Sequence, residues 1–476
     1  MLSPYFTPLI IRLSSILLLF SMASAHSALP DLGAPGLKTY DPETEKKLGD
    51  AFSTILHTQY PLLKDPESLS IFRSIGQKLS QQVSPPRPFS FYLIQAPEIN
   101  AFAGPNGIIG LNTGLILKAD KEDEVAAVLA HEIAHITQQH LSRTLQNQTQ
   151  VNLTSFASLL AAILIGIHDP TAGMATFLGG TSLNLQQQLK NSRLHETEAD
   201  SIGIQYLSQA GYDPHAMGQF FAKLSQAAQF NQDTPPEILR THPVTQRRLA
   251  EAQNRANPLP SPPSQDRLTF KLLKIRIQTL TQPSKTSPSF SSTSNIVQCY
   301  QKNLYWQQQL PPTTTKPDLN CLKTALHQKP QNLYLRLLYA QLLNEQNQAK
   351  SALEQYRLLY NLYPRNSALI HYYSQFLAAQ NQPQKAIQIL NHALSNHNTD
   401  NPFLLYQTLS QIHSQQQQTA EAYYAQAKAY QTIGNQKRYQ YLLQQAQAQL
   451  TPEQTALQKK LKQELKASKI DNPLID

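Results

Sequence analysis

Hydrophobic and polar positions alternate with different periods along the first half of this 476-residue chain. The stretch FSFYLIQ (89–95) alternates at every second position, as a half-buried strand does, and the apolar, glycine-containing stretch 107–117 predicts a second strand. Around them apolar residues recur every three or four positions, which is typical of helices. The helix candidates are 40–85, 121–141, 186–210, 214–228 and 243–257. We therefore expect an α+β, mostly helical domain with a small β-sheet.

The pattern repeats itself in the last third of the chain. The 34-residue segments that begin at Pro330 and Pro364 align without a gap, and Ala352 in the first matches Ala386 in the second. A 34-residue period with these apolar positions resembles tetratricopeptide repeats. The alternatives are an unrelated helical array and a glutamine-rich tract whose similarity is only compositional.

The repeats predict an α-helical solenoid. A third unit follows from Pro402 after a short insertion, and degenerate helices at 319–327 and 437–450 would cap the array. Because such solenoids present binding grooves, we expect this part of the chain to bind proteins rather than to carry out chemistry.

The first 25 residues differ from the rest. Arg12 is their only charged side chain, and it precedes the apolar run 13–20 and the sequence Ala23-Ser24-Ala25. This pattern predicts a secretory signal peptide that is cleaved near Ala25, and hence an exported protein. An uncleaved anchor is the weaker alternative, because the run is far shorter than the roughly 20 residues that cross a bilayer.

Changes in composition divide the rest of the chain. Residues 258–318 are rich in proline and serine, which predicts a linker region. The expected organisation is a signal peptide at 1–25, a first domain at 26–257, the linker region at 258–318 and the repeat domain at 319–476.

If the protein is exported, the two cysteines and one apolar segment can be interpreted further. Cys299 and Cys321 lie 22 positions apart, and an oxidising compartment favours a disulfide between them, although two separate buried thiols are the alternative. The almost uncharged segment 151–167 is about as short as a membrane-spanning helix can be. We expect it to pack against the core of the domain at 26–257 or to cover a cleft in that domain, with a helix embedded in the membrane as the alternative.

Charge is shared unevenly between the two halves. Residues 26–255 contain 17 Lys+Arg and 21 Asp+Glu, a net charge of −4, whereas residues 256–476 contain 22 and 10, a net charge of +12. A basic half can bind nucleic acid. In an exported protein, however, acidic protein surfaces or the anionic groups of an envelope are the expected partners. We therefore expect no nucleic-acid partner, and the charge is compatible with peripheral membrane association.

The segment HEIAH carries the candidate chemistry. Positions i and i+4 share a helix face, so His131 and His135 can reach one metal ion while Glu132 projects beside it toward a bound water. Zinc needs neutral imidazoles, an open position and a base near the water whose pKa it lowers. The motif predicts one Zn²⁺ per chain, with Glu132 as the catalytic base. Two core histidines on a helix are the alternative.

Two histidines need a third ligand, and the stretch LHETEAD (194–200) offers candidates. Glu196 and Asp200 are four residues apart and share a helix face, which fits a ligand followed by a carboxylate that orients the site. His195 is the competing ligand. Glu198 lies on roughly the opposite face, and we expect it to point to solvent.

HEIAH, followed 61 residues after His135 by ETEAD, resembles the HExxH plus ExxxD pattern of the metallopeptidases that include the HtpX and CAAX prenyl protease types. The resemblance implies a zincin-type fold with Glu196 as the third zinc ligand and Asp200 as the aspartate of the motif. THPVTQRR resembles the THPxxxxR motif of these enzymes, at His242 and Arg248. The motif resemblance covers roughly residues 90–250.

The THPVTQRR motif has three interpretations. His242 and Arg248 can stabilise the tetrahedral oxyanion as a hydrogen-bond donor and a cation. Alternatively, a neutral His242 occupies the open zinc position and displaces the water, which would make a latent enzyme that a substrate or partner opens. In the third interpretation, Thr241-His242-Pro243 is only a helix start with a capping threonine.

A signal peptide, a metallopeptidase domain and repeats together resemble the periplasmic members of this family that serve outer-membrane assembly. The resemblance implies a latent zinc endopeptidase that degrades misfolded or stalled outer-membrane proteins and assists their assembly. Its partners would be unfolded or assembling outer-membrane proteins and their assembly machinery. A non-proteolytic chaperone or scaffold with a structural or blocked zinc site is the alternative. In the enzyme, the strand at 107–117 would offer an extended peptide a free sheet edge beside the zinc.

Overall fold

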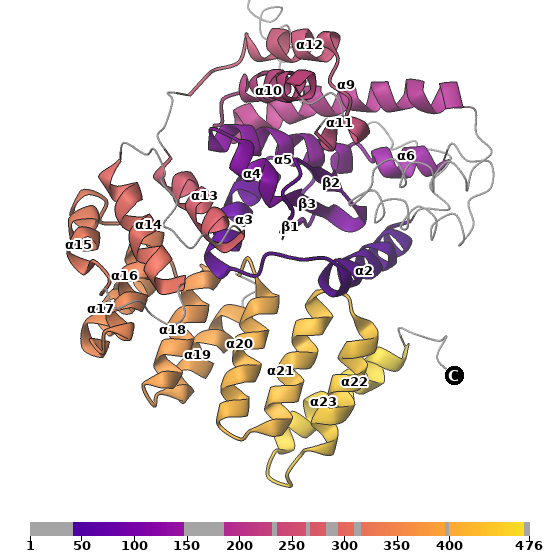
Figure 1. The fold of residues 1–476 in the computed structure, drawn as a ribbon. Coiled ribbons are helices and arrows are strands. Elements are labelled where there is room, and N and C mark those ends of the chain that lie inside the picture. Colours follow the sequence, from indigo (N-terminus) through magenta and orange to yellow (C-terminus); the bar gives the residue numbers. More distant parts are fainter. Residues whose placement is uncertain are drawn as a thin grey trace, which may run out of the picture. The chain divides into compact units, whose positions relative to one another are not determined.

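The computed structural model describes seven stretches of the chain, shown as coloured ribbon in Figure 1. They are 41–146, 185–230, 236–262, 267–281, 294–308, 316–395 and 399–470. The predicted signal peptide at 1–25 and the segment 151–167 lie outside these residues. Within the described stretches, no helix combines the length and the hydropathy needed to cross a membrane.

The sheet has three strands, β1 (Ser90–Ile94), β2 (Ala101–Ala103) and β3 (Ile108–Asn112). β3 lies in the middle, parallel to β1 and antiparallel to β2. The second strand predicted from the sequence is therefore present but shorter, because the chain enters helix α4 (Thr113–Lys118) after Asn112. The expectation that this strand offers a free edge is wrong, since β1 and β2 bond to both of its sides.

Helix α5 (Glu122–Thr137), which carries HEIAH, is the centre of the catalytic domain. It lies between the sheet and α9 (Leu185–Gln209) in Figure 1, and its side chains from Val125 to Ala130 are all buried. A Cβ atom at Gly203 of α9 would lie 3.2 Å from the backbone of Ala130, so the glycine permits α9 to approach α5 closely. The other helices of this domain are α2 (Pro42–Gln59), α3 (Pro66–Ser80), α6 (His140–Gln146), α10 (Ala216–Phe230), α11 (Ile238–Thr241) and α12 (Gln246–Ala256).

The predicted linker region, 258–318, contains two helices, α13 (Leu268–Thr281) and α14 (Asn295–Gln308). Leu272, Leu273 and Tyr300 on these helices are fully buried. The linker region predicted from composition thus contains two helices that contribute to the hydrophobic core. The domain boundaries drawn from composition stay predictions.

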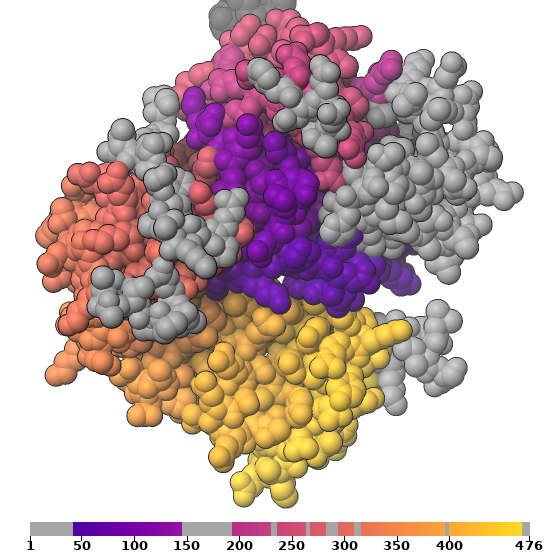
Figure 2. Space-filling model, viewed as in Figure 1, coloured from indigo at the N-terminus to yellow at the C-terminus, as the bar shows by residue number. Residues whose placement is uncertain are grey.

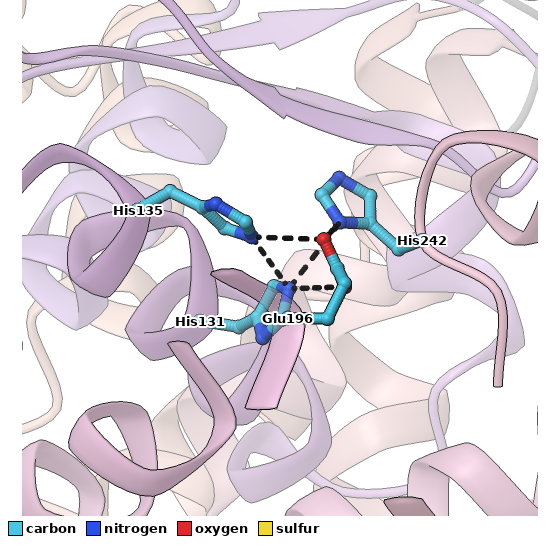
Figure 3. A group of neighbouring side chains, drawn as sticks. All are labelled: His131, His135, Glu196 and His242. Carbon is cyan, nitrogen blue, oxygen red and sulfur yellow. Dashed lines mark hydrogen bonds and ion pairs between the residues drawn. The ribbon is translucent and has the colours of Figure 1, made fainter. Parts of the chain in front are cut away.

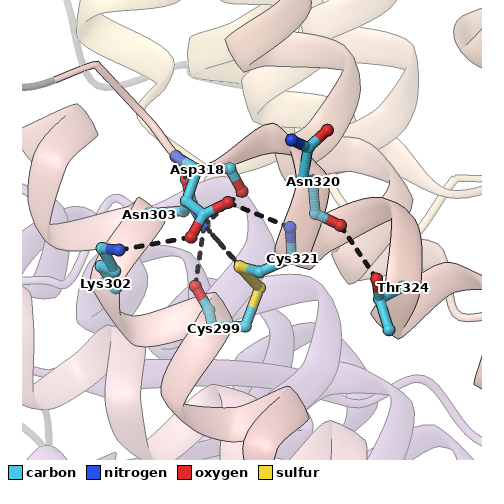
Figure 4. The surroundings of a disulfide bond; sticks show 7 residues. All are labelled: Cys299, Lys302, Asn303, Asp318, Asn320, Cys321 and Thr324. Atoms are coloured by element: carbon cyan, nitrogen blue, oxygen red, sulfur yellow. Dashed lines mark hydrogen bonds and ion pairs between the residues drawn. A yellow bond between two sulfur atoms is a disulfide. The ribbon is translucent and has the colours of Figure 1, made fainter.

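A disulfide between Cys299 and Cys321 joins α14 to the next helix, α15 (Leu319–Gln328) (Figure 4). Asp318 caps α15, because its side chain accepts a hydrogen bond from the Cys321 N–H at 3.1 Å. The N–H of Asp318 in turn donates to Asn303 Oδ1 at 2.8 Å. The two helices are therefore connected by polar contacts as well as by the covalent bond.

The C-terminal part is an array of helices, drawn from orange to yellow in Figure 1, and it fits the tetratricopeptide type. Figure 2 gives the same residues as a space-filling surface in the same colours. The residues that define a unit recur in the structure. Asn332 and Asn366, 34 positions apart, each cap the first helix of a unit, and Asn347 and Asn381 adopt positive φ in the turn between its two helices. The helices are α16 (Leu333–Glu345), α17 (Ala349–Leu362), α18 (Ser367–Ala379), α19 (Pro383–Ser395), α20 (Pro402–Gln415), α21 (Thr419–Thr432), α22 (Gln436–Ala448) and α23 (Thr455–Ile470).

Helix α3 contacts the repeat helices within the compact unit that begins at Pro42. The Ser70 hydroxyl accepts hydrogen bonds from Asn366 Nδ2 at 2.6 Å and from the Tyr334 hydroxyl at 3.2 Å. Arg73 Nη1 donates to the carbonyl of Asp400 at 3.0 Å. Because the asparagine that caps α18 also bonds to α3, the repeat array is tied to the catalytic domain through its own repeating positions.

A buried ionic cluster lies beside these contacts. Arg276 of α13 is only 1% exposed; its guanidinium binds Asp65 at 2.6 Å, and its Nη1 lies 3.1 Å from Glu67 Oε1. Tyr300 and Gln341 contribute further polar contacts, and Gln341 Nε2 donates to Glu67 at 3.3 Å. Burial raises the pKa of Glu67 to about 7, against the attraction of Arg276. One guanidinium thus shares its charge between two carboxylates.

This raised pKa predicts a pH-dependent stability. A carboxyl whose pKa is higher in the folded protein contributes most below its ordinary value of 4.5, and the contribution is lost as the pH rises to about 7. Relative to Glu67→Gln, which does not titrate, the wild type should lose on the order of 3 kcal/mol over this interval. Melting temperatures of both proteins between pH 4.5 and 8 measure it. A difference that does not change with pH would contradict the prediction.

Candidate metal centre

Four side chains direct one donor atom each toward a common point (Figure 3). His131 and His135 come from α5, Glu196 from α9, and His242 directly follows α11. The four donor atoms all lie within 4.8 Å of one another. His135 Nε2 is 3.0 Å from His131 Nε2, and His242 Nδ1 is 2.9 Å from Glu196 Oε1. The structure thus brings together the two histidines of HEIAH, the first glutamate of ETEAD and the histidine of THPVTQRR.

His195, the competing ligand, is not part of this group. Its ring stacks on the ring of His140, with 4.2 Å between the centroids. The helix-face argument explains the difference, since Glu196 lies on the face of α9 that packs against α5, together with Ala199 and Asp200, which are buried.

The four side chains are buried and strongly coupled by charge. Burial would raise the pKa of Glu196, but the nearby imidazoles of His242, His131 and His135 outweigh it and hold this pKa well below its ordinary value. Burial lowers the pKa of His135 to about 3. Burial also acts to lower the pKa of His131, yet the carboxylates of Asp200 and Glu196 raise it to about 10. The group therefore pairs an ionised carboxylate with imidazoles of different basicity.

Asp200 and Arg248 form a buried pair behind His131. Arg248 Nε and Nη2 donate to the two carboxylate oxygens of Asp200, each at 2.8 Å. The remaining nitrogen, Nη1, lies 2.9 Å from Glu196 Oε2 and donates to the Pro243 carbonyl at 2.7 Å. Asp200 Oδ1 is also 3.0 Å from His131 Nδ1, a distance for an ion pair although the geometry is not that of a good hydrogen bond. All three guanidinium nitrogens of Arg248 are thus engaged with neighbouring groups.

The capping threonine of α12 is Thr245, whose hydroxyl accepts a hydrogen bond from the Arg248 N–H at 3.2 Å. The interpretation of Thr241-His242-Pro243 as a helix start is therefore wrong, because α11 ends at Thr241 and α12 begins at Gln246. His242 lies in the connection between the two helices.

Glu132 lies beside the group without a hydrogen-bond partner. It is 1% exposed, and neither carboxylate oxygen bonds to any described residue. His242 Nε2 is 3.6 Å from Glu132 Oε1. The other ring nitrogen of His242, Nδ1, faces Glu196, so this imidazole lies between the carboxylates of Glu196 and Glu132.

The sequence reasoning missed His140. Its Nδ1 lies 2.8 Å from His135 Nδ1, and its Nε2 lies 3.0 Å from Glu198 Oε2. Arg143 donates from Nη1 and Nη2 to the same Glu198 oxygen, at 2.8 and 2.9 Å. The Glu198 side chain is 35% exposed, so it faces solvent in part, but one of its oxygens accepts hydrogen bonds from His140 and Arg143. A histidine five positions after His135 carries no helical spacing signal, because the chain breaks between α5 and α6 at Gln139, with φ of 55°.

An apolar pocket adjoins the group on the side of α10. It encloses about 350 Å³ of empty space, including space open to solvent. Its walls combine side chains of α5, α10 and the α11–α12 connection with the three polar residues His131, His242 and Arg248. The apolar lining residues are Ala127, Val128, Met217, Phe220, Phe221, Leu224, Ile238 and Val244.

The residues present fit a zinc ion. Imidazole nitrogens and a carboxylate oxygen are donors that zinc accepts, commonly four in a tetrahedral arrangement. Both oxygens of Glu132 are buried without a hydrogen bond, and the nearest basic group is His242 Nε2, 3.6 Å from Oε1. Buried carboxylates are costly unless a cation or a proton compensates them. The donor set and this carboxylate together match a zinc ion with a nearby base.

Comparisons with known proteins show that the chain is a metalloendopeptidase. The family model described as peptidase family M48 matches residues 70–256. A beta-barrel assembly-enhancing protease from Escherichia coli K12 is 38% identical over 257 residues, 54% of this chain and 53% of that protein. One from Yersinia pestis is 33% identical over 347 residues, 69% of each chain. The mitochondrial metalloendopeptidase OMA1 of Schizosaccharomyces pombe is 30% identical over 188 residues, 40% of this chain and 52% of that protein. The match to the Escherichia coli protein spans about half of its length.

The Asp200–Arg248 pair predicts a large loss of stability on truncation. Asp200→Ala would leave the buried guanidinium of Arg248 without its bidentate partner, and breaking a buried pair costs about 3–5 kcal/mol. Glu251→Ala is the control, because Glu251 pairs with the exposed Arg247 and pairs of this kind at the surface contribute little to stability. Urea denaturation of the metal-free proteins measures both. Equal losses in the two variants would contradict the prediction.

Proposed function

This chain belongs to peptidase family M48, and on that basis we propose that it is a zinc-dependent endopeptidase of the periplasm. The observation that carries the proposal is the convergence of His131 Nε2, His135 Nε2 and Glu196 on one point, with the unpartnered carboxylate of Glu132 beside it. When bound, zinc would polarise the peptide carbonyl and lower the pKa of a water molecule. His131, His135 and Glu196 would hold it.

Glu132 would serve as the general base and then as the general acid. Its oxygens are free of competing hydrogen-bond donors, so one of them can take the proton of the attacking water and deliver it to the leaving amine nitrogen. Its position one residue after His131 places it next to the metal ligands. Burial excludes bulk water from this carboxylate, which is 1% exposed.

His242 would keep the enzyme latent in the arrangement observed. Its Nδ1 supplies the fourth donor atom of the group, and its Nε2 faces Glu132. A ligand in this place prevents water from reaching the metal next to the base. The side chain of His242 is 17% exposed, against 13% or less for the other three, so it lies on the outer side of the group. A substrate or partner that moves the α11–α12 connection would open the site.

Arg248 would act by holding the carboxylates rather than by binding the oxyanion. Its guanidinium nitrogens are already engaged with Asp200, Glu196 and the Pro243 carbonyl. An arginine with these partners fixes the direction of the ligand Glu196 and of Asp200 behind His131. Arg248, which lies on α12, also bonds to Asp200 on α9 and to Pro243 in the segment that carries His242.

A substrate peptide would find two features beside the site. The strand β2 is paired on one side only among the described strands, so an extended peptide can add to its other edge. The apolar pocket next to His131 and His242 would accept an apolar side chain. Together they favour unfolded chains that alternate in hydrophobicity, as the strands of β-barrels do.

We propose that the substrates are misfolded or stalled outer-membrane proteins. The names of the bacterial relatives, beta-barrel assembly-enhancing proteases, support this substrate class and an association with the assembly machinery. The helical array at the C-terminus would select and hold such chains. Its fixed contacts with α3 would present them to the catalytic domain in a defined position.

A specific observation favours a second candidate, a chaperone or scaffold with a structural zinc. Four protein donors meet in the group, and structural zinc sites are closed by four protein ligands, whereas catalytic sites keep one position open. The buried Glu132 argues against it, because an unpaired carboxylate contributes nothing to a structural site and is costly to bury.

Cleavage of casein by the purified, zinc-loaded protein separates the two functions. We expect slow cleavage by the wild type, faster cleavage by His242→Ala because the fourth donor is gone, and a loss of about 10²–10⁴-fold in Glu132→Gln. His215→Ala is the control, because His215 pairs with Asp213 outside the group. If the wild type and His242→Ala are both inert, the chaperone or scaffold is the better account.

A further inference from the structure

We propose that His140 and Glu198 are positioning residues that fix the tautomer and the ring orientation of His135, so that His135 Nε2 is directed at the metal. We call the chain from His135 through His140 to Glu198 the histidine arm. The inference deepens the proposed function and rests on it, since it concerns how the same site holds zinc. None of the sequence motifs includes His140.

The histidine arm is a continuous series of short contacts. His135 Nδ1 lies 2.8 Å from His140 Nδ1, and His140 Nε2 lies 3.0 Å from Glu198 Oε2. His135 is therefore contacted at both ring nitrogens, by His140 on one side and by the donor group on the other. The arm begins on α5, passes through the first residue of α6 and ends on α9.

The position of each proton follows from the carboxylate at the end of the arm. A carboxylate can only accept, so His140 Nε2 must donate to Glu198. In a neutral His140 the other nitrogen, Nδ1, then carries no proton and accepts. His135 Nδ1 must be the donor of the 2.8 Å contact, which leaves His135 Nε2 with a free electron pair. This is the tautomer that a metal requires from His135.

The end of the arm is itself held in place. Arg143 binds the Glu198 oxygen that His140 contacts, with both terminal nitrogens within 2.9 Å. The ring of His195 stacks on that of His140. His140 is only 4% exposed, so water cannot easily replace the hydrogen bond that it accepts. The positive φ of Gln139 turns the chain after α5 and returns His140 to the side of His135.

The two histidines of HEIAH are supported differently. Asp200 contacts His131 directly and is itself bound by Arg248. Glu198 contacts His135 only through the imidazole of His140, and it is bound by Arg143. Partners of this kind orient metal ligands and raise their basicity, and their loss typically weakens metal binding about 10–100-fold. Because the arm uses an imidazole as its middle member, a side chain that both accepts and donates is needed at position 140.

The test compares His140→Leu with His140→Gln, measuring the zinc dissociation constant of each metal-free protein by competition with a chromophoric chelator. Leucine fills the space without hydrogen bonding, whereas a glutamine amide can accept from His135 and donate to Glu198. We expect His140→Leu to raise the dissociation constant about 10–100-fold and His140→Gln to recover most of this loss. His195→Ala, which removes only the stacking ring, should remain close to the wild type.

Three outcomes would overturn the inference. Dissociation constants of both His140 variants that equal the wild-type value would show that His135 needs no such support. Equal losses in both would show that His140 acts by its shape alone. A wild type that binds no zinc would refute the proposed function itself, and the inference with it.

A second variant guards against a folding defect. The melting temperature of each metal-free variant is measured first. If His140→Leu does not fold, Glu198→Gln replaces it, because this change keeps the shape of the side chain and removes the charge that orients His140. It should weaken zinc binding in the same direction, and an unchanged dissociation constant would overturn the inference.

Discussion

The close packing of α9 against α5 is the constraint on which the rest of the structure depends. The absence of a side chain at Gly203 lets α9 approach the backbone of α5 at Ala130, one residue before HEIAH. With the helices at this distance, Glu196 can join His131 and His135 although the two motifs lie far apart in the sequence. A Cβ atom at Gly203 would require its neighbours, Met217 and the Ala130 backbone, to move by a few tenths of an ångström.

The packing of α9 against α5 also buries the charged side chains of the site. Carboxylates and imidazoles that are removed from water interact strongly and need partners on every side. Asp200 and Glu196 find a partner in the guanidinium of Arg248. The same demand leaves Glu132 as a buried carboxylate without a hydrogen bond, next to the group that we propose to hold zinc. The buried charges of the site are thus paired with neighbouring groups, and Glu132 is the carboxylate among them that makes no hydrogen bond.

The spacing of residues along the chain predicted the features that depend on sequence neighbours. It did not predict the features that depend on pairing between distant segments. Helical periodicity indicated that Glu196 and Asp200 share a face, and the 34-residue period indicated the repeats, since both depend on neighbouring residues. The central position of β3 depends on its two partners, which no local pattern reveals. The contact between His140 and His135 was not predicted, because it depends on the break in the helix at Gln139, which helical spacing does not reveal. The helices of 258–318 were obscured by the proline-rich sequences beside them.

The most direct test of the account is the set of zinc–ligand distances in a crystal structure of the zinc-loaded wild type. The account predicts one zinc ion with His131, His135 and Glu196 as ligands and with His242 Nδ1 as the fourth, at about 2.0–2.2 Å. A zinc ion held by His195 in place of Glu196, or one bound away from HEIAH, would contradict it.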